Sequence, residues 1–366
     1  MQPDTLSHPF AARQQRLRVQ LEARKLSCLL VSNPFNIFYL TGFRGSAGVA
    51  VFADLEAILW VDPRYTLQAH EQARGVTVLE ERAELLKAVG RWLGRKGLRV
   101  VGYDDSYLTC AAFRRLREHV SRAIRLKPAG NLVEDLRRVK DAIEIEQIRQ
   151  AGRLTAAVFE EVLPQIRPGA RESDLAAEIE YRMRRAGADG AAFESIVASG
   201  VRSAWPHARA SSKLLKKSEL VILDLGAILN GYAADMTRTI HLGNPPRRVR
   251  SLYNAVLEAQ RRAVEAVQAG DRTCDVDRAA RRVLRHSRLE RFFTHSTGHG
   301  VGLEIHESPR VARGDKYRLE PGCVITVEPG VYLEGFGGIR IEDTVLVGEG
   351  RPEILTPAPK DDWFIK

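Results

Sequence analysis

The stretch Val221-Ile-Leu-Asp-Leu-Gly226 joins an apolar run to a carboxylate and a glycine, and Val324-Ile-Thr-Val-Glu-Pro-Gly330 has the same form. The two acidic residues, Asp224 and Glu328, lie 104 positions apart. A short apolar run that ends in turn residues is typical of a buried β-strand. The sequence therefore predicts two equivalent buried strands, each of which carries an acid.

Further features repeat in the same order around these two stretches. Each is followed by a glycine, an aromatic residue and a carboxylate-x-Thr sequence, which is Asp235-Met-Thr237 in the first copy and Glu342-Asp-Thr344 in the second. Upstream, residues 166–183 resemble residues 267–284, with a glycine turn before a helical pattern in both copies. Such repeats indicate two related halves. We expect them to face each other across a pseudo-twofold axis, which would bring the equivalent carboxylates together.

Four acids occupy these positions: Asp224, Asp235, Glu328 and Glu342. A single strand acid is more often an ordinary edge residue or an ion-pair partner, but four in repeat-related positions favour a shared site. On buried strands they carry a large desolvation cost, and shared protons or divalent cations relieve their mutual repulsion. Together with a histidine, the four carboxylates predict a site for two metal ions.

Histidines concentrate in residues 292–307, where His295, His299 and His306 fall within twelve positions of a chain that has 9 histidines. Glycines on both sides of His299 permit a tight backbone approach. The segment lacks the GxGxxG spacing of a dinucleotide-binding loop, and Ser-Pro follows His306-Glu307 where a zincin helix needs a second histidine. This density favours a functional cluster over isolated core or surface histidines.

The N-terminal part alternates between strand-like and helical patterns, which predicts a small α/β domain. Helices are expected over residues 10–25 and 83–95, and short strands over residues 49–52, 57–61 and 99–102. The pattern breaks around Lys127-Pro-Ala-Gly130, and a long charged helix is expected over residues 136–157. We therefore predict one domain of residues 1–130 and a second of residues 131–366.

The composition indicates which partners and which cellular compartment to expect. The net charge of +10 comes from short basic pairs interleaved with acids, without a basic stripe that carries aromatic residues, so nucleic acid is not an expected partner. The 4 cysteines are far apart and lack CxxC spacing, which is typical of a reducing compartment. No signal peptide or apolar run of membrane-spanning length is present. We expect a cytoplasmic protein with no membrane partner.

These features resemble the Xaa-Pro peptidases, prolidase and aminopeptidase P, of the pita-bread-fold metallopeptidases of family M24. The matching stretches are residues 193–200, Pro206-His207, 224–226, 235–239, 295–307, 327–330 and 338–344. Residues 33–43 and 62–65 are similar to the accessory domain of that family. The resemblance implies an α+β chain whose C-terminal pita-bread (creatinase/aminopeptidase) fold contains the pseudo-twofold repeat. A smaller creatinase-like α/β domain would precede it.

The resemblance also implies the metal ligands. Asp224 would chelate one ion, Asp235 and Glu342 would bridge both ions, and His299 with Glu328 would hold the second ion. Carboxylate-rich sites suit Mn²⁺, and one imidazole also admits Co²⁺ or Zn²⁺.

The implied chemistry uses the residues around these ligands. Two ions would generate a bridging hydroxide beside a polarised carbonyl, and Glu328 would accept the proton of that water. Thr237 and Thr344 would donate hydrogen bonds to the bridging carboxylates. Arg340 would either orient the substrate or the histidines, or form a salt bridge with a neighbouring acid. Three histidines would line the pocket and donate to the substrate carbonyl and the oxyanion: His207, His295 and His306.

The sequence leaves two related activities open, which differ in the length of the preferred peptide. A prolidase cleaves Xaa-Pro dipeptides, whereas aminopeptidase P removes the residue before proline from longer peptides, and the chain length with its compact N-terminal domain favours prolidase. A creatinase-type amidinohydrolase or a non-catalytic binding protein would have lost ligands, yet all five are present. Methionine aminopeptidase typically lacks such an N-terminal domain. We expect a homodimer that hydrolyses proline-containing dipeptides or short peptides.

Overall fold

The computed structural model describes residues 9–361 and 363–365. The chain forms two compact units, of which the first ends at Arg137 and the second begins at Arg138. Helix α6 (Leu132–Arg137) is tied into the first unit, because the Arg137 guanidinium donates to Asn36 Oδ1 at 2.8 Å and the Tyr39 hydroxyl donates to the Leu136 carbonyl at 3.2 Å. The first unit therefore continues beyond the break in the sequence pattern at residue 130.

The sequence predicts one long helix over residues 136–157, and the predicted start of this helix is wrong. The chain leaves α6 and begins α7 (Ala142–Val162) after Asp141, whose carboxylate accepts from the backbone N–H groups of Ile143 and Glu144 at 3.0 Å each. The Glu144 carboxylate accepts from the Asp141 N–H at 3.1 Å and completes a capping box. A cap residue inside the charged segment thus begins a new helix.

The first unit is a six-stranded sheet in the order β4-β3-β2-β1-β5-β6. Strand β2 runs antiparallel to β1 and β3, and the other neighbours are parallel. Its strands are β1 (Cys28–Val31), β2 (Val49–Ala53), β3 (Ala57–Val61), β4 (Thr77–Glu80), β5 (Val100–Tyr103) and β6 (Arg125–Pro128). Its other helices are α1 (Pro9–Ala23), α2 (Pro34–Thr41), α3 (Thr66–Gln72), α4 (Leu85–Arg95) and α5 (Cys110–His119).

The second unit consists of two halves of similar construction. The first half contains α7, η1 (Leu163–Gln165), α8 (Glu172–Arg185), β7 (Gly190–Ala191), β8 (Ile196–Ser199), η2 (Gly200–Ala204), β9 (Leu220–Leu225), β10 (Ala227–Leu229), β11 (Tyr232–Ala233) and β12 (Met236–Leu242). The second contains α9 (Arg247–Glu265), α10 (Thr273–His286), η3 (Glu290–Phe292), β13 (Gly298–Gly300), β14 (Glu307–Val311), β15 (Val324–Val327), β16 (Gly330–Leu333), β17 (Gly337–Arg340), β18 (Asp343–Leu346) and β19 (Glu353–Ile354). The final strand, β20 (Phe364–Ile365), returns to pair with β12.

Equivalent backbone contacts show the internal repeat. Before α8, the amide of Gly169 donates to the carbonyl of Leu215 at 2.9 Å, and before α10 the amide of Gly270 donates to the carbonyl of Leu319 at 2.8 Å. Both helices follow a glycine turn, as the sequence predicts. The two halves are therefore related in structure as well as in sequence.

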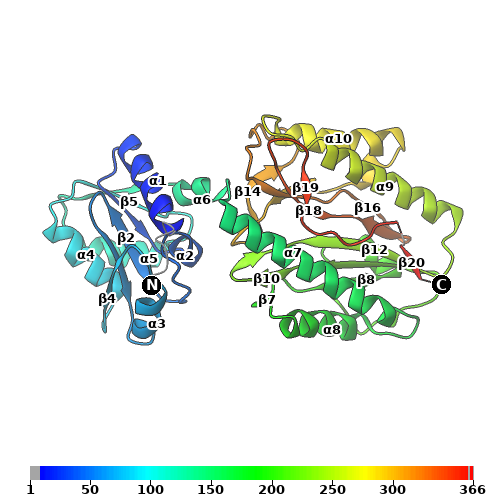
Figure 1. The fold of residues 1–366 in the computed structure, drawn as a ribbon, viewed down its shortest axis with the longest axis horizontal. Helices are drawn as coiled ribbons and strands as arrows, with labels where there is room; N and C mark the ends of the chain where they lie inside the picture. The colour runs from blue at the N-terminus through cyan, green and yellow to red at the C-terminus, as the bar shows by residue number, and fades with distance from the viewer. Residues whose placement is uncertain (1–8, 362, 366) are drawn as a thin grey trace, which may run out of the picture. The chain divides into compact units, whose positions relative to one another are not determined.

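Each half has its own pair of long helices, α7 and α8 in the first half and α9 and α10 in the second (Figure 1). Each pair packs in an apolar core. Helices α7 and α8 pack on β8, β9 and β12 through residues that include Phe159, Ile179 and Val221. Residues of α9 and α10, among them Val276, share a core with Ile325 of β15 and other residues of the second half. Strands β9, β12 and β15 are buried along their whole length. Acids on or beside these strands are consequently withdrawn from water.

Within the described ranges, none of the helices is both long and apolar enough to cross a membrane.

Candidate metal centre

The inner strands of both halves position four acidic side chains. Asp224 lies on β9 opposite Thr237 of antiparallel β12, and Asp235 directly precedes β12. Glu328 directly follows β15, and Glu342 directly precedes β18, which pairs with β15. Each half therefore contributes two acids at or near the ends of paired strands.

His299, on β13, joins these acids. Its Nε2 atom lies 3.7 Å from Asp235 Oδ2 and 3.6 Å from Glu328 Oε1. Asp235, His299 and Glu342 offer ligand atoms that all lie within 4.8 Å of one another. The fold thus gathers residues that are far apart in the sequence into one cluster.

The carboxylates of this cluster repel one another in a buried environment. Burial, followed by the charges of Glu342, Asp224 and Glu328, raises the pKa of Asp235 well above its usual range. Burial and the charges of Glu328 and Asp224 raise the pKa of Glu342 in the same way. Burial, with a contribution from Asp224, also raises the pKa of Glu328 to about 7. The cluster therefore holds protons at neutral pH unless cations replace them.

The donor atoms fit divalent cations. Asp224 Oδ1 and Asp235 Oδ1 are buried, and neither accepts a hydrogen bond from any residue that the structure describes. Buried oxygens without a partner are costly, and a cation would supply that partner. Burial lowers the pKa of His299 to about 4, so its imidazole is neutral, as coordination requires. Carboxylates with one imidazole form a donor set that suits Mn²⁺ and admits Co²⁺ or Zn²⁺.

Two threonines fix the acids that precede β12 and β18. Thr237 Oγ1 donates to Glu342 Oε2 at 2.6 Å. Thr344 Oγ1 donates to the backbone carbonyl of Asp235 at 2.8 Å and accepts from its N–H at 3.1 Å. Thr237 therefore contacts a carboxylate, as the resemblance implies, whereas Thr344 holds its acid through the backbone.

Arg340 is buried beside the acids. Its Nη2 donates to Asp224 Oδ2 at 2.6 Å, so the salt bridge that we considered from the sequence is present. Its Nη1 donates to the Tyr332 hydroxyl at 2.9 Å and to the Pro206 carbonyl at 3.1 Å. Because Pro206 precedes His207, the same guanidinium also anchors the segment that carries this histidine.

Tyr332 belongs to the cluster, although the sequence analysis did not single it out. Its hydroxyl lies 2.9 Å from His295 Nε2. Burial raises the pKa of Tyr332 to about 12, so the hydroxyl keeps its proton. His295 Nδ1 faces the carbonyl of Ser296 at 2.8 Å, which leaves Nε2 to accept from Tyr332.

The three predicted pocket histidines lie in different settings. His295 Nδ1 is 3.8 Å from Glu328 Oε2. Burial and then Arg340 lower the pKa of His295 to about 4, with a smaller contribution from His207. The rings of His299 and His306 are in contact, with centroids 4.4 Å apart. His207 and His306 are exposed, so they lie at the solvent side of the cluster while His295 lies inside it.

Comparisons with known proteins match both parts of the chain. Residues 146–349 match the model of metallopeptidase family M24, and residues 13–139 match that of the creatinase/prolidase N-terminal domain. A Xaa-Pro dipeptidase of Pyrococcus furiosus is 35% identical over 351 residues, which cover 95% of this chain and 99% of that protein.

Solved structures agree with these matches. A Xaa-Pro dipeptidase from Bacillus anthracis superposes with a TM-score of 0.94 at 36% identity, covering 97% of this chain and 100% of its own. An X-Pro aminopeptidase from Thermotoga maritima superposes with a TM-score of 0.89 at 34% identity, covering 96% of this chain and 100% of its own. The predicted architecture, a pita-bread fold after a creatinase-like domain, is confirmed.

Proposed function

Because the chain belongs to metallopeptidase family M24, we propose that it hydrolyses the Xaa-Pro bond of dipeptides with two divalent metal ions. Members of this family are hydrolases, so the class of reaction follows from membership. We propose the metal ligands, the substrate and the roles of single residues in addition to that class of reaction.

The convergence of three buried carboxylates, the partly exposed Glu328 carboxylate and a neutral imidazole carries the proposal. We assign Asp224 to one ion, Asp235 and Glu342 to both ions, and His299 with Glu328 to the other. The Oδ1 atoms of Asp224 and Asp235 support this assignment, because both are buried and accept no hydrogen bond from the described residues. When bound, the two ions supply Lewis-acid polarisation of the peptide carbonyl and an acidified water.

Glu328 is suited to move a proton between water and the leaving group. A general base must lie within reach of the proton that it takes. The Glu328 carboxylate lies 3.6 Å from His299 Nε2 and 3.8 Å from His295 Nδ1. In this role Glu328 takes a proton from the attacking water and returns it to the proline nitrogen as the peptide bond breaks.

The three histidines have two different proposed roles, positioning and hydrogen-bond donation to the substrate. Both ring nitrogens of His295 have partners within the chain, Ser296 and Tyr332, so we assign His295 to hold Tyr332 and through it Arg340. His207 and His306 are exposed at the cluster. We assign these two to donate to the substrate carbonyl and to the developing oxyanion.

Three similar proteins support the order in which we rank the candidate substrates. The Xaa-Pro dipeptidases of P. furiosus and B. anthracis are 35% and 36% identical to the chain over nearly its whole length, which supports a dipeptidase. The X-Pro aminopeptidase of T. maritima is 34% identical. Removal of the first residue from longer peptides is therefore the second candidate.

The proposal extends to the metal and the assembly. Mn²⁺ is the ion we propose, because four of the five assigned ligand residues are carboxylates. We also propose a cytoplasmic homodimer. Light scattering tests the assembly directly, and a monomer at micromolar concentration would contradict the dimer.

Hydrolysis of three peptides with added Mn²⁺ tests the proposed function: Ala-Pro, Ala-Pro-Ala and the proline-free Ala-Ala. Cleavage of Ala-Pro alone supports the dipeptidase. Equal or faster cleavage of Ala-Pro-Ala moves the assignment to an aminopeptidase. Cleavage of Ala-Ala at the same rate would contradict proline specificity, and no cleavage of any peptide would contradict the proposed activity.

A further inference from the structure

Glu342 is held at two points by neighbouring residues of β12. Thr237 Oγ1 donates to its carboxylate, whereas Arg238 Nη1 donates to its backbone carbonyl at 2.5 Å. Successive side chains of a strand leave on opposite faces. The carboxylate of Glu342 is therefore fixed from one face of β12, and its backbone is fixed from the other.

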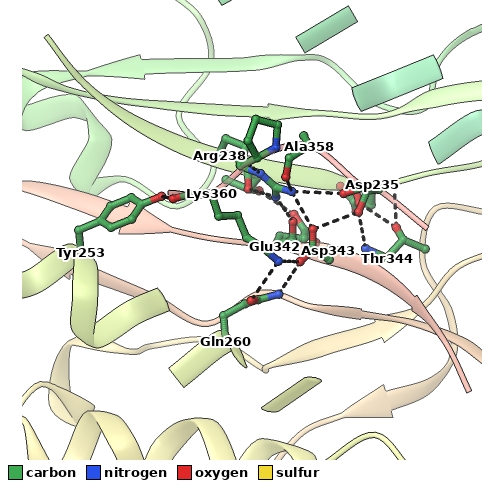
Figure 2. Close-up of polar contacts among 12 residues, drawn as sticks. Asp235, Arg238, Tyr253, Gln260, Glu342, Asp343, Thr344, Ala358 and Lys360 are labelled. Carbon is green, nitrogen blue, oxygen red and sulfur yellow. Dashed lines mark hydrogen bonds and ion pairs between the residues drawn. The ribbon is translucent and has the colours of Figure 1, made fainter. Parts of the chain in front are cut away.

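Arg238 is a buried cation with every guanidinium nitrogen engaged (Figure 2). Only 2% of the residue is exposed to solvent. Besides Glu342, it donates to the carbonyls of Thr237, Thr356, Ala358 and Pro359 and to the carboxylate of Asp343. Its bonds to residues 356–359 attach a segment near the end of the chain to the strand that follows Asp235.

Asp343, the neighbour of Glu342, is the second centre of these contacts. Its carboxylate accepts from Arg238 Nη2 at 2.8 Å, from Gln260 Nε2 of α9 at 2.7 Å and from Lys360 Nζ. It also accepts from Thr356 Oγ1 at 3.3 Å. Figure 2 shows Gln260 and Lys360 approaching the same carboxylate. One side chain thus joins β18, α9 and the segment at residues 356–360.

The same segment reaches the second acid through Thr344. The backbone N–H of Thr344 donates to Thr356 Oγ1 at 3.0 Å, while its hydroxyl bonds to both backbone groups of Asp235. Asp235 and Glu342 therefore share one set of outer contacts. We call Arg238, Asp343 and residues 356–360 the C-terminal brace.

We propose that the C-terminal brace is a positioning device for the metal centre, which sets the affinity for divalent ions by fixing the backbones of Asp235 and Glu342. This inference rests on the proposed function, because it takes these two acids as the bridging ligands. The brace contributes two cations, Arg238 and Lys360, against one acid, Asp343.

The alternative is a brace that only stabilises the fold. The two roles differ in one measurable respect. A positioning device changes the affinity for metal in a chain that remains folded, whereas a purely structural contact changes the unfolding temperature and leaves the affinity of the folded chain unchanged. Partners that orient metal ligands typically change metal affinity about 10- to 100-fold when they are removed.

The test compares Asp343→Asn and Lys360→Met with the unmodified chain and with Arg262→Gln. Arg262 lies on the same helix as Gln260, but it is exposed and pairs with Glu258 and Glu265 at 2.7 and 2.9 Å. Each protein is stripped of metal with a chelator, and its Mn²⁺ binding is measured by calorimetry. Its thermal midpoint is measured without metal. Lys360→Met keeps the Arg238–Asp343 pair, so it preserves the test if Asp343→Asn fails to fold.

We expect the Kd for Mn²⁺ to rise about 10-fold or more in both brace variants and to stay within about twofold in Arg262→Gln. An unchanged Kd in folded brace variants, with only a lower thermal midpoint, would overturn the inference and leave the proposed function intact. Absence of Mn²⁺ binding by the unmodified chain would overturn the proposed function together with the inference.

Discussion

Arg340 Nη2 lies 2.6 Å from Asp224 Oδ2, and this ion pair joins β17 of the second half to β9 of the first. The remaining oxygen of Asp224, Oδ1, is buried and accepts no hydrogen bond from the described residues. One carboxylate therefore has one oxygen committed to a cationic side chain and one oxygen free for a ligand. Arg340 orients Asp224 as well as neutralising it.

Replacement of Arg340 by lysine keeps the charge but removes the planar fork that reaches Asp224, Tyr332 and Pro206 together. We expect kcat for Ala-Pro to fall roughly 10- to 100-fold, as is typical when a partner of a metal ligand is lost. Steady-state kinetics with Mn²⁺ measure this effect. Arg285→Lys, at an exposed pair with Glu290, is the control and should keep its activity. Unchanged kcat in Arg340→Lys would show that only its charge matters.

Asp235→Asn removes one negative charge from the cluster and one proposed bridging ligand. We expect fewer than two ions per chain by elemental analysis and a loss of turnover of roughly 100-fold or more. Because the carboxylates repel one another, the metal-free variant should unfold at the same temperature as the metal-free unmodified chain or higher. A full complement of metal in a folded variant would contradict the ligand assignment.

Gly298 allows β13 to approach β15 closely. A Cβ atom at this position would lie 1.9 Å from the Thr326 carbonyl oxygen, and the next residue is His299. Gly298→Ala must therefore shift the histidine, and we expect it to lower the free energy of unfolding by about 1–3 kcal/mol. Weaker Mn²⁺ binding should accompany this change.

Gly350→Ala is the matched control, because no atom lies within 4 Å of a Cβ at that position. Urea unfolding and calorimetry on both variants measure the two effects. Equal metal affinity of Gly298→Ala and Gly350→Ala would show that the close approach does not position His299.

Asp104 gives the first unit a pH-dependent stability. Burial raises the pKa of Asp104 to about 6 from a usual value of 3.8, although the carboxylate accepts from Ser32 and Asn33. A raised pKa means that the folded state binds the proton more tightly, so this contribution is fully present below 3.8 and is lost as pH rises through about 6.

The Asp104→Asn variant separates this group from the others that titrate. The free energy of unfolding of the unmodified chain should decline relative to that of the variant, by up to about 3 kcal/mol, between about pH 4 and about pH 7. Urea unfolding followed by circular dichroism at each pH provides the comparison. A difference between the two proteins that stays constant across this range would contradict the assignment.

The internal repeat explains why so much of the candidate site was visible in the sequence. Apolar runs that end in Asp224 and Glu328 predict buried strands, and the repeat predicts that the two halves converge. The metal-ligand cluster follows from these two expectations. The apolar runs predict where the strands lie in the sequence, and the internal repeat predicts which strands come together.

Other contacts leave no pattern in a single sequence. Tyr332 reads as one more aromatic residue of a strand, and its role depends on where His295 and Arg340 lie after folding. Several partners of Arg238 are more than a hundred positions away, among them Asp343 and Ala358. The start of α7 was different, because Asp141 and Glu144 have the spacing of a capping box and would have marked it.

Titration of the metal-stripped chain with Mn²⁺, with proline release from Ala-Pro followed at each addition, tests the two-metal account most directly. The account predicts no hydrolysis without metal and full activity only after two ions per chain have bound. Hydrolysis of Ala-Pro by the metal-free chain, or full activity after a single ion, would contradict it.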